Sequence, residues 1–417
     1  SIYTVSMVKH IALILFFSIP SFADEGAVSL QEAYTSASKN ADYDLLNRSI
    51  KGQAKSRLEQ AKSYLFPKIT ATGTYKEDRS DTDSDKTETS QKSVSINLRQ
   101  PLFKGGLSSG IQKEKAGVEA SEITVKQNDL NLFQTVAKSY YRILLLESTL
   151  EVLKEIDQVS FNRVKIIRSR VAIGRSKRSD LLSNELQNQA FRIELGQLQV
   201  SLQAERESFS RLTGLSSIVT LSKEEALPNL KQMDYYIHKM PDMPGLQLQA
   251  KSVRIAEKSE SVLKSQHLPS LYLDLGAKFG EITNNDEGQD LTALLTLEVP
   301  LFEGGRVSAE AREAAWKRNE ETAKYLALQK DNLLLLKNLY NGLQKDIEFF
   351  SIYEESLSTA KKNYQFFNKE LKLGLVSNLE LLSSLTDYLN AKKNREEAYF
   401  QLKLAELNLK QLVGEID

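Results

Sequence analysis

The side chains that could do enzyme chemistry are few in this sequence and lie far apart. The chain of 417 residues has no cysteine, which excludes disulfides, thiolate zinc sites, iron–sulfur clusters and cysteine nucleophiles. Its three histidines, His10, His238 and His267, are too widely spaced to form a metal-ligating motif. The acidic residues lie on repetitive segments and form no compact group with a base and a nucleophile. The sequence therefore does not support an enzyme, and we expect no catalytic residue, no metal and no cofactor.

One glycine-rich segment could be mistaken for a phosphate-binding loop. Residues 105–110 read GGLSSG, but Ile111 and Gln112 follow where that loop requires lysine and then serine or threonine. The 55 basic and 55 acidic side chains give a formal charge of zero, without the basic excess typical of proteins that bind nucleic acid. We therefore expect no nucleic-acid partner.

Residues 1–23 have the pattern of a secretory signal peptide. Lys9 precedes an apolar stretch at residues 11–19, and Ser21 and Ala23 place small residues at −3 and −1 of a cleavage site. Nine apolar residues are too few to span a bilayer core of about 30 Å, so the segment does not fit a membrane anchor. Met7 is the expected initiator, and we predict that the mature chain is exported.

Four short motifs occur twice, in the same order and about 200 residues apart, which indicates a duplicated fold. The matching pairs are residues 63–67 with 265–269, 100–106 with 299–305, 171–174 with 371–374, and 212–214 with 412–414. We therefore predict a first repeat at residues 24–214 and a second repeat at 246–417. The inter-repeat, or equatorial, segment at 215–245 contains three prolines and breaks the helical pattern.

Long helices and four short strands are predicted in these repeats. Apolar residues recur at alternating spacings of three and four in residues 133–143 and 333–350, which is typical of helices packed as coiled coils. Residues 306–372 contain no proline and could form one helix of roughly 100 Å. Apolar and polar residues alternate as in membrane barrels in four segments, at about residues 66–76, 92–102, 268–280 and 290–301.

Four strands cannot close a membrane barrel, which needs about eight or more. Because open sheet edges are not tolerated in hydrocarbon, several copies must combine their strands, and three copies would give twelve. A barrel of twelve strands is wide enough for an aqueous lumen. The hydrophilic links at residues 77–91 and 282–289 are then expected to be exterior loops, with all helices on the opposite side. An alternative, a secreted coiled-coil scaffold or adhesin without a pore, explains the helices but not the strands.

With these features the chain resembles the TolC-like outer-membrane efflux proteins. The resemblance rests on the duplicated strand–strand–helix plan, on the two Pro-Leu-Phe-x-Gly-Gly corners, and on glycine-centred turns at Gly174 and Gly374. It implies a mainly α-helical fold with a small membrane β part. Three chains would form a twelve-stranded β-barrel in the outer membrane of a Gram-negative bacterium, continued by an α-helical barrel, or tunnel, in the periplasm.

The implied function is a passive exit duct for efflux of small molecules or for type I protein secretion. The implied partners are two further copies of the chain, outer-membrane lipid, a periplasmic adaptor (membrane fusion) protein, and an inner-membrane transporter of the RND or ABC type. The strand-to-helix corners would contain Pro101, Gly105, Gly106, Pro300, Gly304 and Gly305. Proline cannot donate to a β-ladder and is expected at a strand end, while paired glycines allow the backbone to turn into the helix.

The resemblance also places Gly174 and Gly374 at the far periplasmic tips, where an adaptor would bind. In the family, acidic side chains just after these glycines line the closed tunnel entrance, and the matching positions are Asp180 and Glu380. The same two acids also fit ordinary first-turn residues favoured by the helix dipole, and the sequence leaves both interpretations open.

The lock of this entrance is expected to differ from that of the best-known members. Ser383 stands at the next acidic position of the family, and Leu371 and Val376 stand where basic and tyrosine partners would be. Arg175, Lys177 or Arg178 could supply replacement contacts; these three basic residues all follow Gly174 closely.

Overall fold

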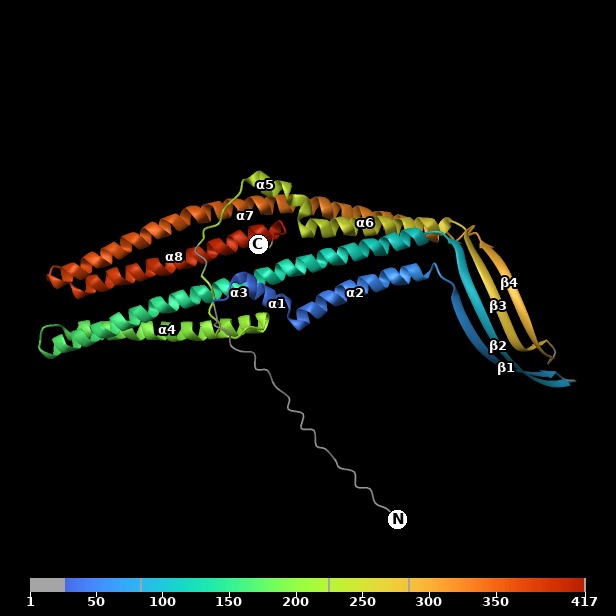
Figure 1. Cartoon of the computed structure of the whole chain (residues 1–417), viewed down its shortest axis with the longest axis horizontal. Helices are drawn as coiled ribbons and strands as arrows, with labels where there is room; N and C mark the ends of the chain where they lie inside the picture. Colours follow the sequence, from blue (N-terminus) through green and yellow to red (C-terminus); the bar gives the residue numbers. More distant parts are fainter. Residues whose placement is uncertain (1–26, 83–84, 224–225, 284–285, 416–417) are drawn as a thin grey trace, which may run out of the picture.

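Long helices lie side by side along one axis, and four strands extend from one end of them (Figure 1). The computed structural model describes residues 27–82, 85–223, 226–283 and 286–415. The predicted signal peptide lies outside the described residues. No helix within the described ranges is long and apolar enough to cross a bilayer.

Each half of the chain contains one very long helix that is followed by a shorter one. The first half has α1 (Leu30–Ser38), α2 (Ala41–Ser63), β1 (Lys68–Thr82), β2 (Asp85–Lys104), α3 (Leu107–Ala172) and α4 (Arg178–Thr213). The short α5 (Met233–His238) follows, and then come α6 (Pro244–Lys264), β3 (Ser270–Thr283), β4 (Asp286–Glu298), α7 (Arg306–Lys372) and α8 (Asn378–Leu412). Helix α7 has 67 residues, which corresponds to roughly 100 Å and confirms the continuous helix predicted there.

The predicted apolar seams are buried where the long helices pack. Phe133, Val136, Tyr140 and Ile143 of α3 are at most 4% exposed. Leu336, Leu343 and Phe350 of α7 are buried in the same core cluster. This cluster lies midway along the bundle, where α1 and α5 pack beside the long helices (Figure 1). A smaller cluster of α3 and α8 residues continues the core toward the helix tips.

The four strands form one antiparallel sheet in the order β1-β2-β3-β4, so β1 and β4 are its edges. The four predicted strands are present, but the first hairpin is longer than expected. The prediction of a loop at residues 77–91 was wrong for most of that range, because Lys76 pairs with Gln91 and the ladder continues to Thr82 and Asp85. The same holds at 282–289, where Thr283 pairs with Asp286. Backbone hydrogen bonds hold such a ladder without apolar side chains, so hydrophilicity did not mark where the strands end.

The two prolines of the corners do not occupy equivalent positions. Pro101 lies within β2, beside a shift in register between Pro101 and Phe103. A proline is tolerated there because an irregular ladder position does not require its missing N–H group. Pro300 follows the end of β4 at Glu298. The prediction of a strand end therefore fits Pro300 and needs correction for Pro101.

Candidate functional site

The sheet has one apolar and one polar face across all four strands. One row of directly paired residues on the apolar face contains Ala71, Ile96, Ala277 and Leu291. Leu291 is 73% exposed in the single chain, so this face has no covering layer of protein. The adjacent row points to the opposite face and contains Thr70, Asn97, Gly276 and Thr292. An apolar exterior with a polar interior is the pattern of a membrane barrel wall.

Charged side chains of both signs lie on the polar face. The guanidinium of Arg99 pairs with the Asp274 carboxylate at 2.9 Å and lies 4.7 Å from the centre of the Tyr272 ring. Lys68 and Lys278 line the same shallow hollow of about 590 Å³. Such a mixed surface suits contact with water.

The two strand-to-helix corners share the conformation of the glycine next to the helix, but they differ at the preceding glycine, where Gly304 has φ 61° and Gly105 has no positive φ, and they differ in packing. Gly106 precedes α3 with φ 82° and Gly305 precedes α7 with φ 83°, a left-handed conformation that favours glycine. A side chain at Gly105 would collide with the backbone carbonyl of Ser265. Within one chain, nothing lies within 4 Å of the corresponding position at Gly304. The first corner is therefore packed against the second half of the chain, and the second corner is open.

The helix tips lie at the end of the molecule opposite the sheet (Figure 1). Gly174 and Gly374 adopt φ values of 72° and 73°. The backbone N–H of Arg175 donates to the Arg170 carbonyl at 2.8 Å, and the N–H of Leu375 donates to Glu370 at 3.0 Å. The two turns therefore have the same geometry, at positions 200 residues apart.

Asp180 and Glu380 both lie in the first turn of a helix, but only Glu380 belongs to a capping box. The Ser377 N–H donates to the Glu380 carboxylate at 2.6 Å, and the Glu380 N–H donates to the Ser377 hydroxyl at 3.3 Å. Hydrogen bonding of its carboxylate to the backbone and the side chain of Ser377 holds the pKa of Glu380 below its ordinary value. Helix α4 has Lys177 at the corresponding position and no side-chain cap.

Within the described part of one chain, no hydrogen bond or ion pair joins Asp180 to Glu380. Both side chains are exposed, as are Arg175, Lys177 and Arg178. Leu371 and Val376 are half-buried, and Ser383 is exposed. The single chain thus leaves two acidic and three basic side chains at the tips available for contacts with other molecules.

A charged clamp that the sequence reasoning missed holds the inter-repeat segment to α8. Lys223 pairs with the buried Glu396 at 2.9 Å, and Arg395 pairs with Glu396 at 2.9 Å and with Glu354 at 3.2 Å. Burial raises the pKa of Glu396, but Lys223 and Arg395 outweigh that effect and hold it below its ordinary value. Lys223 and Glu396 are 173 residues apart in the chain, so no local pattern could have indicated the contact.

A second missed feature lies nearer the tips. Arg163 is only 8% exposed, and its Nε atom has no hydrogen-bond partner among the described residues. Burial lowers the pKa of its guanidinium. The signal in the sequence that could have revealed this feature was the charged Arg163 within an otherwise apolar helix interface.

Comparisons with known proteins agree with this architecture. A family model described as "Outer membrane efflux protein" matches residues 52–215 and 242–415. The "Outer membrane protein TolC" of Vibrio cholerae is 24% identical over 406 residues, which cover 93% of this chain and 91% of that protein. The "Alkaline protease secretion protein AprF" of Pseudomonas aeruginosa is 22% identical and covers 84% of this chain and 73% of that protein.

Solved structures with the same fold cover nearly the whole chain. The CusC channel protein superimposes with a TM-score of 0.82 at 15% identity, covering 95% of this chain and 96% of that one. The Campylobacter jejuni CmeC outer membrane channel gives a TM-score of 0.80 at 14% identity, covering 99% and 94%. At these identities the likeness establishes the fold.

Proposed function

Because the chain belongs to the outer membrane efflux protein family, we propose that three copies form one exit duct through the periplasm and the outer membrane. The duct carries its cargo passively, as small-molecule efflux or type I protein secretion, and does no chemistry of its own. Residues 24–214 and 246–417 are its two structural repeats, joined by the equatorial segment at 215–245.

The observation that carries this proposal is the open sheet. It has four strands, one apolar face and two unpaired edges, β1 and β4. A bilayer does not tolerate unpaired edges, so each edge must pair with the edge of another copy. Pairing β4 of one copy with β1 of the next closes a ring, and three copies give twelve strands with the polar faces inside.

In this proposal the helix tips form the periplasmic end of the duct. Asp180 and Glu380 line its entrance, and the turns at Gly174 and Gly374 contact a periplasmic adaptor protein. The adaptor links the duct to an inner-membrane transporter of the RND or ABC type, which supplies the energy. The corners at Pro101, Gly105, Gly106, Pro300, Gly304 and Gly305 connect the barrel to the tunnel. The matching φ values at the two tips, and at Gly106 and Gly305 of the corners, support equivalent roles in the two repeats.

Native mass spectrometry of the mature chain in detergent tests the assembly. We expect a trimer, which should require detergent for its extraction from membranes. A stable monomer with four ordered strands, or a coiled-coil protein that is soluble without detergent, would contradict the proposal.

Deletion of the gene tests the cargo. Export of secreted proteins should be compared with sensitivity to several toxic small molecules, because the duct accommodates either kind of cargo. If the deletion strain kept both its protein export and its resistance to toxic small molecules, that result would contradict an exit duct.

A further inference from the structure

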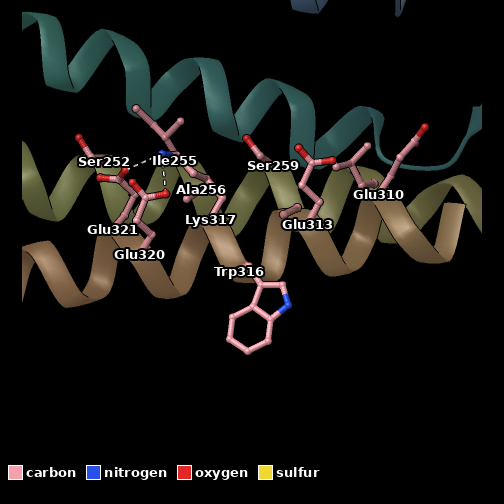
Figure 2. A pocket seen from close by; sticks show the side chains of 12 residues that line it. Ser252, Ile255, Ala256, Ser259, Glu310, Glu313, Trp316, Lys317, Glu320 and Glu321 are labelled. Carbon is pink, nitrogen blue, oxygen red and sulfur yellow. Dashed lines mark hydrogen bonds and ion pairs between the residues drawn. The ribbon is translucent and has the colours of Figure 1, made fainter. Parts of the chain in front are cut away.

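The only tryptophan of the chain, Trp316, is largely exposed on the outer face of α7. Val307 and Ala314 lie on the opposite side of α7 and are buried, and Arg318 pairs there with Glu260 of α6. Figure 2 shows that the indole points away from α6, at the outer rim of the hollow that α6 and α7 line. At 72% exposure, Trp316 leaves a large apolar ring in contact with water, which is costly unless another surface covers it.

The helix at the other edge of the same copy has a complementary shape. Helix α2 packs on α3 through the buried Ala54. Its opposite side contains Leu45, Ser49, Gly52, Ser56 and Ser63, which recur at helical spacing. A side chain at Gly52 would meet nothing within 4 Å, so the helix surface has a notch there. Small side chains on both sides of Gly52 widen that notch.

The indole and the notch lie at the same depth along the molecule. Helix α2 ends and α7 begins beside the sheet (Figure 1). Gly52 lies eleven residues before the end of α2 at Ser63, or about 16 Å. Trp316 lies ten residues after the start of α7 at Arg306, or about 15 Å. If β4 of one copy pairs with β1 of the next, Trp316 of the first copy and Gly52 of the second therefore lie at about the same distance from the sheet.

The charges of the two edge helices also complement each other. On α2, the exposed side chains Lys51, Lys55, Arg57 and Lys62 form no ion pair within the described part of the copy. On α7, Glu310, Glu320 and Glu321 are paired with basic neighbours, whereas the exposed Glu313 is not. Glu59 on α2 and Arg312 on α7 are also exposed and form no ion pair within the described part of the copy, so the complementary charges are the basic side chains of α2 and Glu313, which lies one turn from Trp316.

From these observations we infer that the occupant of the Trp316 face is α2 of a second copy, with the indole seated over Gly52. This inference rests on the proposed function, which gives the number of copies as three. It goes further by naming the side chains that hold neighbouring copies together below the barrel. Each Trp316 fills the notch of the next copy, so the trimer contains three identical contacts.

Cross-linking tests the contact directly, because the chain has no cysteine of its own. Packed helix axes lie about 8–10 Å apart, so cysteines in the double variant Gly52→Cys/Trp316→Cys are within reach of a short bis-maleimide. We expect covalent dimers and trimers on a denaturing gel. The matched control, Gly52→Cys/Thr322→Cys, places the second cysteine on α7 but off the Trp316 face and should remain monomeric on the gel. Equal cross-linking in both variants would contradict the inference.

Tryptophan fluorescence of the unsubstituted trimer provides a second, independent measurement. We expect a blue-shifted emission and quenching by acrylamide severalfold weaker than for an exposed indole. Gly52→Leu fills the notch and should restore quenching, whereas Gly196→Leu, at a distant and equally open helical glycine, should not. A trimer by native mass spectrometry that shows neither cross-links nor protection of Trp316 overturns this inference alone. The absence of any trimer overturns the proposed function as well.

Discussion

Glu380 caps α8 and, in the proposed entrance, also contributes a charge. The substitution Glu380→Gln separates the two roles, because a capping box accepts glutamine as well as glutamate. We predict that Glu380→Gln, combined with Asp180→Asn, leaves the trimer intact but weakens its cation selectivity and its block by multivalent cations from the periplasmic side. The measurement is conductance in planar bilayers. Unchanged selectivity and block in the double variant would show that both acids are only first-turn residues.

The pH dependence of Glu380 follows from its capping hydrogen bonds. Because its pKa is held below the ordinary value, the carboxylate is charged throughout the neutral range. Its contribution to α8 is present above the ordinary carboxyl pKa and is lost as the pH falls through the lowered one. Sequence offset alone matched Asp180 with Glu380, but their surroundings differ because the Ser377 hydroxyl can cap a helix and the Lys177 ammonium cannot accept a hydrogen bond. Equivalence in the repeat therefore predicted that both acids lie in the first turn of a helix, but it did not predict that only Glu380 takes part in a capping box.

At the scale of elements, the two corners should respond differently to the same substitution. Gly105→Ala forces a collision with the backbone carbonyl of Ser265, which directly follows α6, and neither segment can yield without moving the corner. Gly304→Ala meets no neighbour within the chain, so its cost is the left-handed conformation alone, about 1–2 kcal/mol. We expect Gly105→Ala to lower the dissociation temperature of the trimer more than Gly304→Ala does. The reverse order would mean that another copy packs against the second corner.

The clamp between the inter-repeat segment and α8 should weaken in acid. The pKa of Glu396 is lowered in the folded chain, so its stabilising effect is full above the ordinary value of 4.5 and is lost as the pH falls through the lowered pKa. Hydrogen exchange at residues 217–223 should therefore accelerate between neutral and acidic pH. Glu396→Ala should give the faster exchange already at neutral pH, because it leaves Lys223 and Arg395 without their shared partner at a cost of about 1–3 kcal/mol. Exchange that stays unchanged in this variant would assign the attachment of the segment to its apolar contacts alone.

Elements with a long regular pattern could be predicted from the sequence, and contacts between distant residues could not. The apolar seam of α7 repeats over many turns, so its helix was evident. The extension of the first hairpin to Thr82 and Asp85 was not predicted, because serine, threonine and charged residues do not interrupt a β-ladder and give no pattern that shows where it ends. The clamp at Glu396 depends on how the whole chain folds back on itself, which no local spacing encodes.

At the scale of the whole molecule, the two ends differ in chemistry, and this predicts the orientation in the membrane. Both hairpins extend beyond the apolar rows of the sheet as polar ladders, whereas the strand-to-helix corners lead at once into the helices. With the barrel in the outer membrane, the hairpin ends must face the medium and the tips near Gly174 the periplasm.

A cysteine introduced by Thr82→Cys should react on intact cells with a bulky, membrane-impermeant maleimide. A cysteine at the tip, from Ile173→Cys, should react only after the outer membrane is permeabilised. Since the chain has no cysteine of its own, the unsubstituted protein is a clean control. Labelling of Ile173→Cys but not Thr82→Cys on intact cells would show that the orientation is inverted, and the helices would then have to lie outside the cell, where no adaptor or inner-membrane transporter could reach them.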